Sequence, residues 1–403
     1  MQYLRRPAII AMVLFGTCAV AVACGSFGED DLGPAPALTP DGGGIEGSTA
    51  EEAGPKPPCD PANLVQNKLH CGRCDHDCLG GECEGGVCKP SVLATLPKVP
   101  IGIAVDERRV VWAEGNLIYH CDKRGCANAP TAVRTAANDF HAVVGTPKHT
   151  LFTAGGGSNG HAGRLALDDT YEQLGLMTGG SPQALATDGT QLVALNDANA
   201  LQGGLYRGLV STPGLSLVAS RKLPSETMLR NWAYVALNGS QVFVADYGTV
   251  HGCSLPSCAA GWSVAAGGIN GVRGLAATST DLYWTVLTPP SLQTCSIQPG
   301  GGGCGTSKSL AGGRLKADAV PHDLFFHGDR LHVTSGDTLG TCVPATCDSS
   351  WTEYAVGETI RGRPAADDTA IFWIAYDVPQ PDASAPDTGP SPPENIRLMK
   401  LAK

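Results

Sequence analysis

The chain has 403 residues, of which 52 are Gly, 29 Pro and 16 Cys, and its formal net charge is −10. With 42% apolar and only 16% charged residues, the composition excludes a largely disordered protein. The negative charge also argues against a nucleic-acid partner, because binding to phosphates recruits clusters of Lys and Arg.

The N-terminus has the pattern of an export signal. Arg5 and Arg6 precede an apolar run from Ala8 to Ala23. The run is short for a membrane span, which needs about 20 residues, and it suits a signal peptide over residues 1–23. Ordinary secretion and a retained anchor are the alternatives.

The end of that run, Ala21-Val22-Ala23-Cys24, resembles a bacterial lipobox, although a Leu usually stands where Ala21 does. The resemblance implies cleavage before Cys24, a lipid on its thiol and a membrane-attached protein. Gly25 resembles the class destined for the outer membrane, so we expect attachment there or at the cell surface, with a secreted or periplasmic protein as the alternative.

Residues 24–58 then form a linker, because Pro, Gly, Asp and Glu dominate and large apolar residues are few. We predict that this linker is disordered and tethers the folded part to the lipid.

A cysteine-rich segment follows over residues 59–90. Six cysteines within 30 residues favour a small scaffold held by disulfides, and their pairing stays open among 15 possibilities. The phrase CGRCDHDCLGGECEGGVC, residues 71–88, resembles stigma-specific-protein modules. A zinc site at 71–74 with His70 and His76 is the alternative, which an oxidising compartment disfavours. The six cysteines are Cys59, Cys71, Cys74, Cys78, Cys83 and Cys88.

Residues 91–403 contain the same sequence pattern seven times. A short apolar triplet recurs every 40 to 50 residues, from Val110-Val111-Trp112 to Ile371-Phe372-Trp373, and a second apolar run and a tight turn precede each copy. Repeats of this length built from short strands indicate a β-propeller, so we predict an all-β, seven-bladed propeller. The run Pro100-x-Gly-Ile-Ala-Val-Asp106 resembles propellers of the NHL and YVTN kind.

The ring closes with an N-terminal strand in this prediction. The chain ends one strand short of a full last blade, and residues 91–97 resemble the fourth strands of other blades. Pairing them with residues 395–402 would remove an exposed edge. Residues 377–393, rich in Pro, are predicted to be a disordered insertion within the last blade.

Eight further cysteines lie in pairs after the third strand of four repeats. Two cysteines that flank a hairpin turn can reach disulfide distance, so we predict four local disulfides. The pairs are Cys121–Cys126, Cys253–Cys258, Cys295–Cys304 and Cys342–Cys347.

Candidate functional residues stand near the start of each innermost strand. In propeller enzymes these positions face the mouth of the central channel, and here they include His141, His322, Asp323 and Arg363. Such a set could carry acid–base chemistry or could line a wet channel. Tyr234, Arg273 and Gly274 occupy comparable positions.

No recognised catalytic, cofactor or metal motif accompanies these residues. We therefore predict a monomeric, non-catalytic binding or scaffold lipoprotein whose ligand is a protein or a glycan, without a cofactor. The alternative is an exported hydrolase, lactonase or lyase that uses His141, His322, Asp323 and Arg363.

Overall fold

The structure is a computed structural model of the whole chain. It describes residues 57–126, 129–156, 159–178, 180–197, 204–219, 234–246, 248–258, 261–298, 303–310, 315, 321–355, 360–377 and 394–403. All of them belong to one compact unit, Lys56–Lys403. The predicted signal peptide, Cys24, the linker up to residue 56 and almost all of the 377–393 insertion lie outside the described residues.

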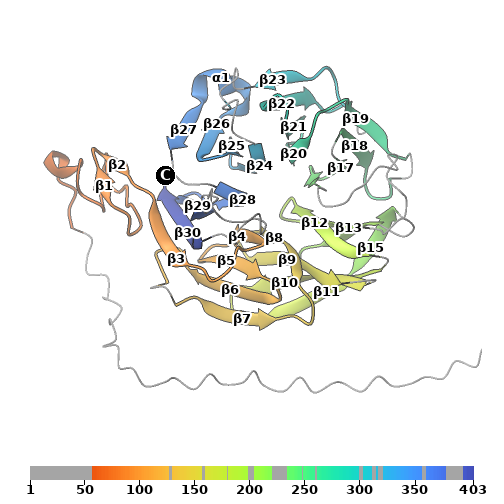
Figure 1. The fold of residues 1–403 in the computed structure, drawn as a ribbon, viewed down its shortest axis with the longest axis horizontal. Helices are drawn as coiled ribbons and strands as arrows, with labels where there is room; N and C mark the ends of the chain where they lie inside the picture. Colours follow the sequence, from red (N-terminus) through yellow and green to blue (C-terminus); the bar gives the residue numbers. More distant parts are fainter. Residues whose placement is uncertain are drawn as a thin grey trace, which may run out of the picture. The chain divides into compact units, whose positions relative to one another are not determined.

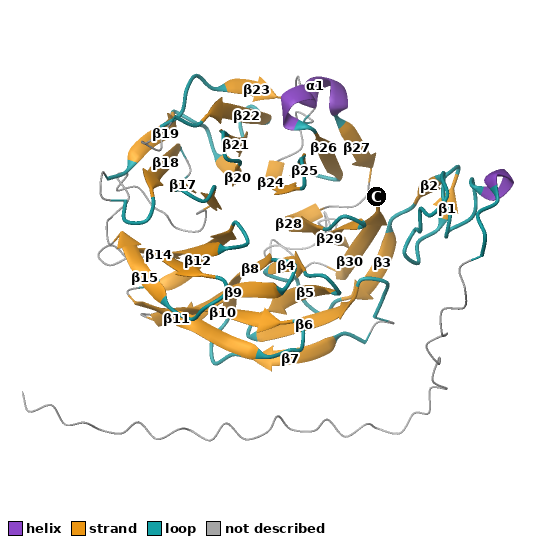
Figure 2. Cartoon of the chain, turned by 180° about the vertical axis from the view of Figure 1, so that it is seen from behind, coloured by secondary structure: helices purple, strands orange, loops and turns teal. Residues whose placement is uncertain are grey.

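Seven four-stranded antiparallel sheets form a ring, as predicted (Figures 1 and 2). In each of blades 1 to 6 the strands follow chain order from the axis outward. Blade 1 consists of β4 (Gly102–Val105), β5 (Arg109–Glu114), β6 (Leu117–Asp122) and β7 (Thr131–Thr135). Blade 2 consists of β8 (Phe140–Gly145), β9 (His149–Gly156), β10 (Asn159–Ala166) and β11 (Tyr171–Thr178). Blade 3 consists of β12 (Ser181–Thr187), β13 (Gln191–Asp197), β14 (Gly204–Leu209) and β15 (Leu215–Ala219).

The remaining blades follow the same plan, with two short helical turns in blade 6. They consist of β16 (Tyr234–Leu237), β17 (Gln241–Ala245), β18 (Thr249–Ser254) and β19 (Ser263–Gly267); β20 (Val272–Ala277), β21 (Asp281–Val286), β22 (Ser291–Ser296) and β23 (Lys308–Leu310); β24 (Pro321–His327), β25 (Arg330–Ser335), β26 (Thr338–Cys342), η3 (Pro344–Thr346), α1 (Cys347–Ser350) and β27 (Thr352–Ala355); and β28 (Ile360–Ala366), β29 (Ala370–Asp377), β30 (Glu394–Ala402) and β3 (Ser91–Thr95).

The same side-chain to backbone hydrogen bond recurs at the turn between the first and second strands. A residue just after the innermost strand accepts a hydrogen bond from the backbone N–H three positions later, which closes an Asx or Ser/Thr turn. Six blades use it, with donor–acceptor distances of 2.7 to 3.0 Å, and the accepting residues are Asp106, Thr146, Asp188, Asn238, Thr278 and Asp367. These turns explain why Asp, Asn and Thr recur with the period of the repeat.

The second strand of each blade carries the apolar triplet and is buried. Trp112, Phe152, Phe243 and Phe372 are 0% exposed, and Trp284 is 2% exposed. Their alternate side chains point to opposite faces of the sheet, so each strand packs against the blades on both sides. The core is therefore divided into clusters between neighbouring blades, as a ring of sheets requires.

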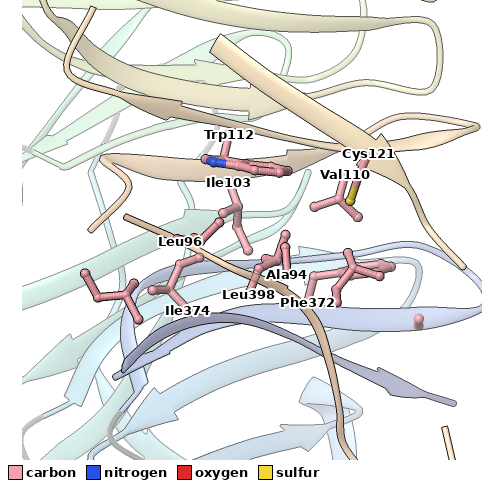
Figure 3. Close-up of a cluster of buried hydrophobic side chains, with 12 residues drawn as sticks. Ala94, Leu96, Ile103, Val110, Trp112, Cys121, Phe372, Ile374 and Leu398 are labelled. Carbon is pink, nitrogen blue, oxygen red and sulfur yellow. The ribbon is translucent and has the colours of Figure 1, made fainter. Parts of the chain in front are cut away.

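The ring is closed by the strand predicted for this role. β3 pairs antiparallel with β30, with Val92 opposite Met399 and Thr95 opposite Arg397. Behind this seam lies a buried cluster shared by blades 7 and 1, in which Ala94 and Leu398 face Ile103 and Trp112 (Figure 3). The outer edge of blade 7 is thus paired rather than open.

The cysteine-rich segment contains η1 (Pro61–Asn63) and a hairpin of β1 (Cys83–Glu84) and β2 (Val87–Cys88). Gly85 and Gly86 form its two-residue turn with φ of +62° and +80°, which glycine adopts at no steric cost. Three disulfides staple the segment: Cys59–Cys74, Cys71–Cys83 and Cys78–Cys88. The sulfurs of Cys71, Cys78 and Cys88 lie within 4.8 Å of one another, but disulfide bonding removes the thiolates that zinc would need.

Three local disulfides lie after third strands, at Cys253–Cys258, Cys295–Cys304 and Cys342–Cys347. Blade 1 differs from the prediction, because Cys121 and Cys126 are thiols. The buried Cys121 thiol is hydrogen-bonded to Cys126, and Cys126 Sγ donates to the Leu93 carbonyl at 3.5 Å. Each sulfur thus has a hydrogen-bonding partner without a covalent bond.

A buried lysine joins three segments at the ring closure. Lys400 on β30 is 2% exposed, and its Nζ donates to the carbonyls of Lys123 and Arg124 at 3.1 Å and also to that of Leu79. Leu79 belongs to the cysteine-rich segment, so one ammonium group holds that segment, blade 1 and blade 7 together. Hydrogen bonds to a charged group are stronger than neutral ones, which offsets the cost of burying the charge.

Candidate functional site

The innermost strands are irregular where candidate residues were predicted. Antiparallel pairing shifts register at His141, at Gln183 and at Arg273, and it shifts again between Pro321 and Asp323 and between Arg361 and Ala365. A β-bulge turns a side chain away from its regular direction and is frequent at functional sites. Five of the seven blades therefore break their regular pairing at the same level of the ring.

Close packing of the innermost strands accompanies these bulges. Each innermost strand contacts the innermost strand of both neighbouring blades. At Gly274 a Cβ atom would stand 2.9 Å from the Leu324 backbone nitrogen, which is too close for any larger residue. Gly274 thus allows β20 to approach β24 and brings Arg273 toward blade 6.

Electrostatic interactions link four of the predicted positions, which we call the axial cluster: Tyr234, Arg273, Asp323 and Arg363. They come from blades 4, 5, 6 and 7 in order. Burial raises the pKa of the Asp323 carboxyl to about 6, and the Arg363 charge and the Leu324 N–H, which donates to Oδ1 at 2.8 Å, oppose that rise. Burial raises the pKa of the Tyr234 phenol, as does the charge of Asp323, while Arg273 lowers it.

The chemistry of the axial cluster follows from these pKa directions. Tyr234 remains a protonated hydrogen-bond donor at neutral pH, and the two guanidinium groups are always charged. Asp323 exchanges its proton near pH 6, so the net charge of the cluster changes in that range. Two Arg side chains with a phenol suit a ligand that presents a carboxylate or another planar anionic group.

Of the two predicted histidines, only His141 has a described side chain. His141 lies on β8 in blade 2, where its Nε2 is 2.7 Å from the Gly155 carbonyl oxygen. His322 lies on β24 next to Asp323, and its side chain is outside the described residues. The charged groups that act on Asp323 and Tyr234 come from blades 5 to 7, so His141 is not part of the arrangement that was predicted for acid–base work.

A second site was not predicted from the sequence. A pocket of about 350 Å³ lies between blades 5 and 6, with Tyr283 and Phe326 among its lining residues. Both aromatics belong to apolar strand patterns that favour a core role, and Lys308 and Asp329 beside them resemble ordinary surface residues. No local signal in the sequence marks this pocket, because its walls come from two different blades.

The disulfides indicate the compartment of the protein. Six disulfides within one chain are typical of proteins outside the reducing cytoplasm. Among the described residues, no helix has the length and apolar character that a membrane crossing requires.

Comparisons with known proteins identify no family for this chain. No family model matches the chain, and no curated protein matches it. Many solved structures are similar. A chain of a nidogen/laminin complex is 15% identical, with a TM-score of 0.43, and the match covers 57% of this chain and 86% of that one.

Two further solved structures have similarly low sequence identity and TM-scores. The computationally designed protein Ika8 is 13% identical with a TM-score of 0.49, and the match covers 71% of this chain and 85% of that one. PorZ, a surface component of the type-IX secretion system of Porphyromonas gingivalis, is 11% identical with a TM-score of 0.49 over 70% of this chain and 36% of its own.

The described fold is a seven-bladed β-propeller preceded by a disulfide-rich segment.

Proposed function

We propose that the protein is an exported lipoprotein of the cell envelope, anchored through Cys24, whose propeller is a non-catalytic binding or scaffold unit for a protein or glycan partner. The lipobox-like sequence supports the anchor, and the disulfides support export. Two or more acyl chains hold a protein stably at a membrane, whereas one chain does so only marginally. The acylated N-terminal peptide should be detectable by mass spectrometry of membrane-extracted protein.

The observation that carries the binding function is the axial cluster. Tyr234, Arg273, Asp323 and Arg363 offer hydrogen-bond donors and one titrating carboxyl, a set of groups that can recognise an anionic partner.

A capture experiment tests this proposal. Purified wild-type protein and the Arg273→Ala, Arg363→Ala double variant are incubated with envelope extract, and bound proteins and glycans are identified by mass spectrometry. We expect the wild type to enrich a partner and the double variant to lose it. Equal capture by both proteins, or capture of nothing by either, would contradict the proposed role of the cluster.

The alternative function is an exported hydrolase, lactonase or lyase. One observation favours it, namely that the pKa of Asp323, about 6, suits a group that exchanges protons near neutral pH. Turnover of an ester, lactone or glycan panel by the wild type, abolished in the His141→Ala, His322→Ala, Asp323→Asn triple variant, would establish this alternative over the binding role.

A further inference from the structure

The pocket between blades 5 and 6 combines an apolar wall with fixed polar groups. Blade 5 contributes the turn between β20 and β21 and parts of β21 to β23. Blade 6 contributes β24, the turn that follows it and the segment 343–345 after β26. Its volume of about 350 Å³ lies at the small end of the range of small-molecule sites. The groups that matter here are Thr280, Asp281, Tyr283, Lys308, Phe326 and Asp329.

The apolar wall consists of two aromatic rings from different blades. The centroids of Tyr283 and Phe326 are 5.1 Å apart, and their planes meet at 72°. Tyr283 is 5% exposed, whereas Phe326 is only partly buried and offers part of its ring to the pocket. Burial and the charge of Asp281 raise the pKa of the Tyr283 phenol, so its O–H stays protonated and hydrogen-bonded to Thr294 and Thr278.

A fixed carboxylate stands beside this wall. Asp281 Oδ1 accepts a hydrogen bond from the Ser296 hydroxyl at 2.9 Å, and Oδ2 accepts one from the Thr280 hydroxyl at 2.6 Å. An ionised carboxylate has about four acceptor sites, so about two remain for a ligand. Because both oxygens are held, the carboxylate is oriented before any ligand arrives, which lowers the entropy cost of binding.

The pocket entrance carries charges of both signs on exposed side chains. Lys308 provides an ammonium donor on blade 5, and Asp329 provides a carboxylate acceptor on blade 6. With Asp281, the pocket has two carboxylates and one ammonium and is therefore net negative. An anionic ligand is repelled, while a neutral ligand with several hydroxyls meets acceptors and donors on one side and an apolar wall on the other.

We propose that this pocket binds a neutral saccharide unit of one or two pyranose rings. The ring C–H groups pack on Phe326 and Tyr283, and neighbouring hydroxyls donate to Asp281 and Asp329 and accept from Lys308. This inference rests on the proposed function, in which the protein binds a partner at the cell envelope, and it specifies that the partner is a glycan.

The test measures saccharide binding directly. Full-length protein is titrated by calorimetry with neutral di- to tetrasaccharides of glucose, galactose, mannose and N-acetylhexosamines, with uronic-acid oligomers, and with a peptide library. We expect at least one neutral saccharide to bind, and we expect Asp281→Asn and Phe326→Leu each to weaken that binding about ten- to a hundredfold. Lys308→Ala should weaken binding as well. Lys148→Ala, which changes an exposed lysine on the turn before β9, is its matched control and should leave affinity unchanged.

The outcomes separate this inference from the proposed function. Absence of binding to every neutral saccharide, stronger binding to uronic acids or peptides, or binding that Asp281→Asn and Phe326→Leu leave intact would overturn the saccharide pocket. The capture experiment with the axial variants reports on the envelope role independently, because neither Arg273 nor Arg363 lines this pocket. Unchanged thermal unfolding of each variant shows that a loss of binding is not a loss of fold.

Discussion

His332 is a buried imidazole whose burial should make the protein acid-sensitive. It lies on β25, is 1% exposed, and stacks on Phe325 with 4.9 Å between ring centroids. Neither ring nitrogen has a hydrogen-bond partner among the described residues. Burial, together with the charges of Lys403, His327 and Arg330, lowers the pKa of His332 from 6.5 to about 3. The folded protein therefore keeps this ring neutral.

The sign of the effect follows from the two pKa values. Below pH 6.5 the unfolded chain binds a proton at His332, while the folded protein does not until pH approaches 3. Stability that is present above pH 6.5 is thus lost as the pH falls, by about 1.4 kcal/mol for each pH unit. At pH 5 the loss from this one residue is about 2 kcal/mol.

His332→Phe keeps an aromatic ring on Phe325 and removes the titrating group. Urea unfolding of the wild type and of this variant at pH 7.5 and pH 5 gives the difference in unfolding free energy between the two conditions. We expect the wild type to lose about 2 kcal/mol more than the variant. Thr341→Val, which changes the buried cross-strand neighbour without a titrating group, should retain the wild-type pH dependence. An equal pH dependence in wild type and His332→Phe would refute the reasoning.

Three further predictions follow from buried polar groups. Arg363→Gln should raise the pKa of Asp323 above about 6, because the Arg363 charge opposes the rise caused by burial. NMR titration of the Asp323 carboxyl measures this pKa, and an unchanged value in the variant would contradict the prediction. Lys400→Met should speed hydrogen exchange at residues 79–81 and 122–125, since the carbonyls of Leu79, Lys123 and Arg124 lose their donor, while blade 4 remains protected. Peptide mapping without reduction should find Cys121 and Cys126 alkylated and the six disulfides intact; recovery of a Cys121–Cys126 cross-link would show that the predicted pair forms.

The repeat was predictable because its signals are local. The buried triplet on each second strand and the Asp, Asn or Thr that closes the preceding turn recur within every blade, so the period appears in the sequence itself. Ring closure was predictable for the same reason, since residues 91–97 have the pattern of a fourth strand with no blade before them. The positions of Tyr234, Arg273, Asp323 and Arg363 followed once the innermost strands were aligned.

Other features depend on contacts between distant segments and carry no local pattern. Lys400 sits among apolar residues in a strand where a lysine usually faces solvent. The carbonyls of Leu79, Lys123 and Arg124 accept hydrogen bonds from its buried ammonium group. The pairing of six clustered cysteines depends on how one short segment folds, and spacing alone leaves 15 possibilities. The saccharide pocket requires Tyr283 and Phe326 to meet across two blades.

The closure of the ring also determines how the axial cluster is held. Arg363 lies on β28, the innermost strand of blade 7, while β3 is the outermost strand of the same blade. Two strands, β29 and β30, separate them, so an opening that begins at β3 must break two further strand pairs before it reaches Arg363. Lys400 holds β30 to blade 1 and to the cysteine-rich segment, which opposes the first of these steps. A force that detaches β3 therefore reaches β28, on which Arg363 lies, only after these further strand pairs have separated.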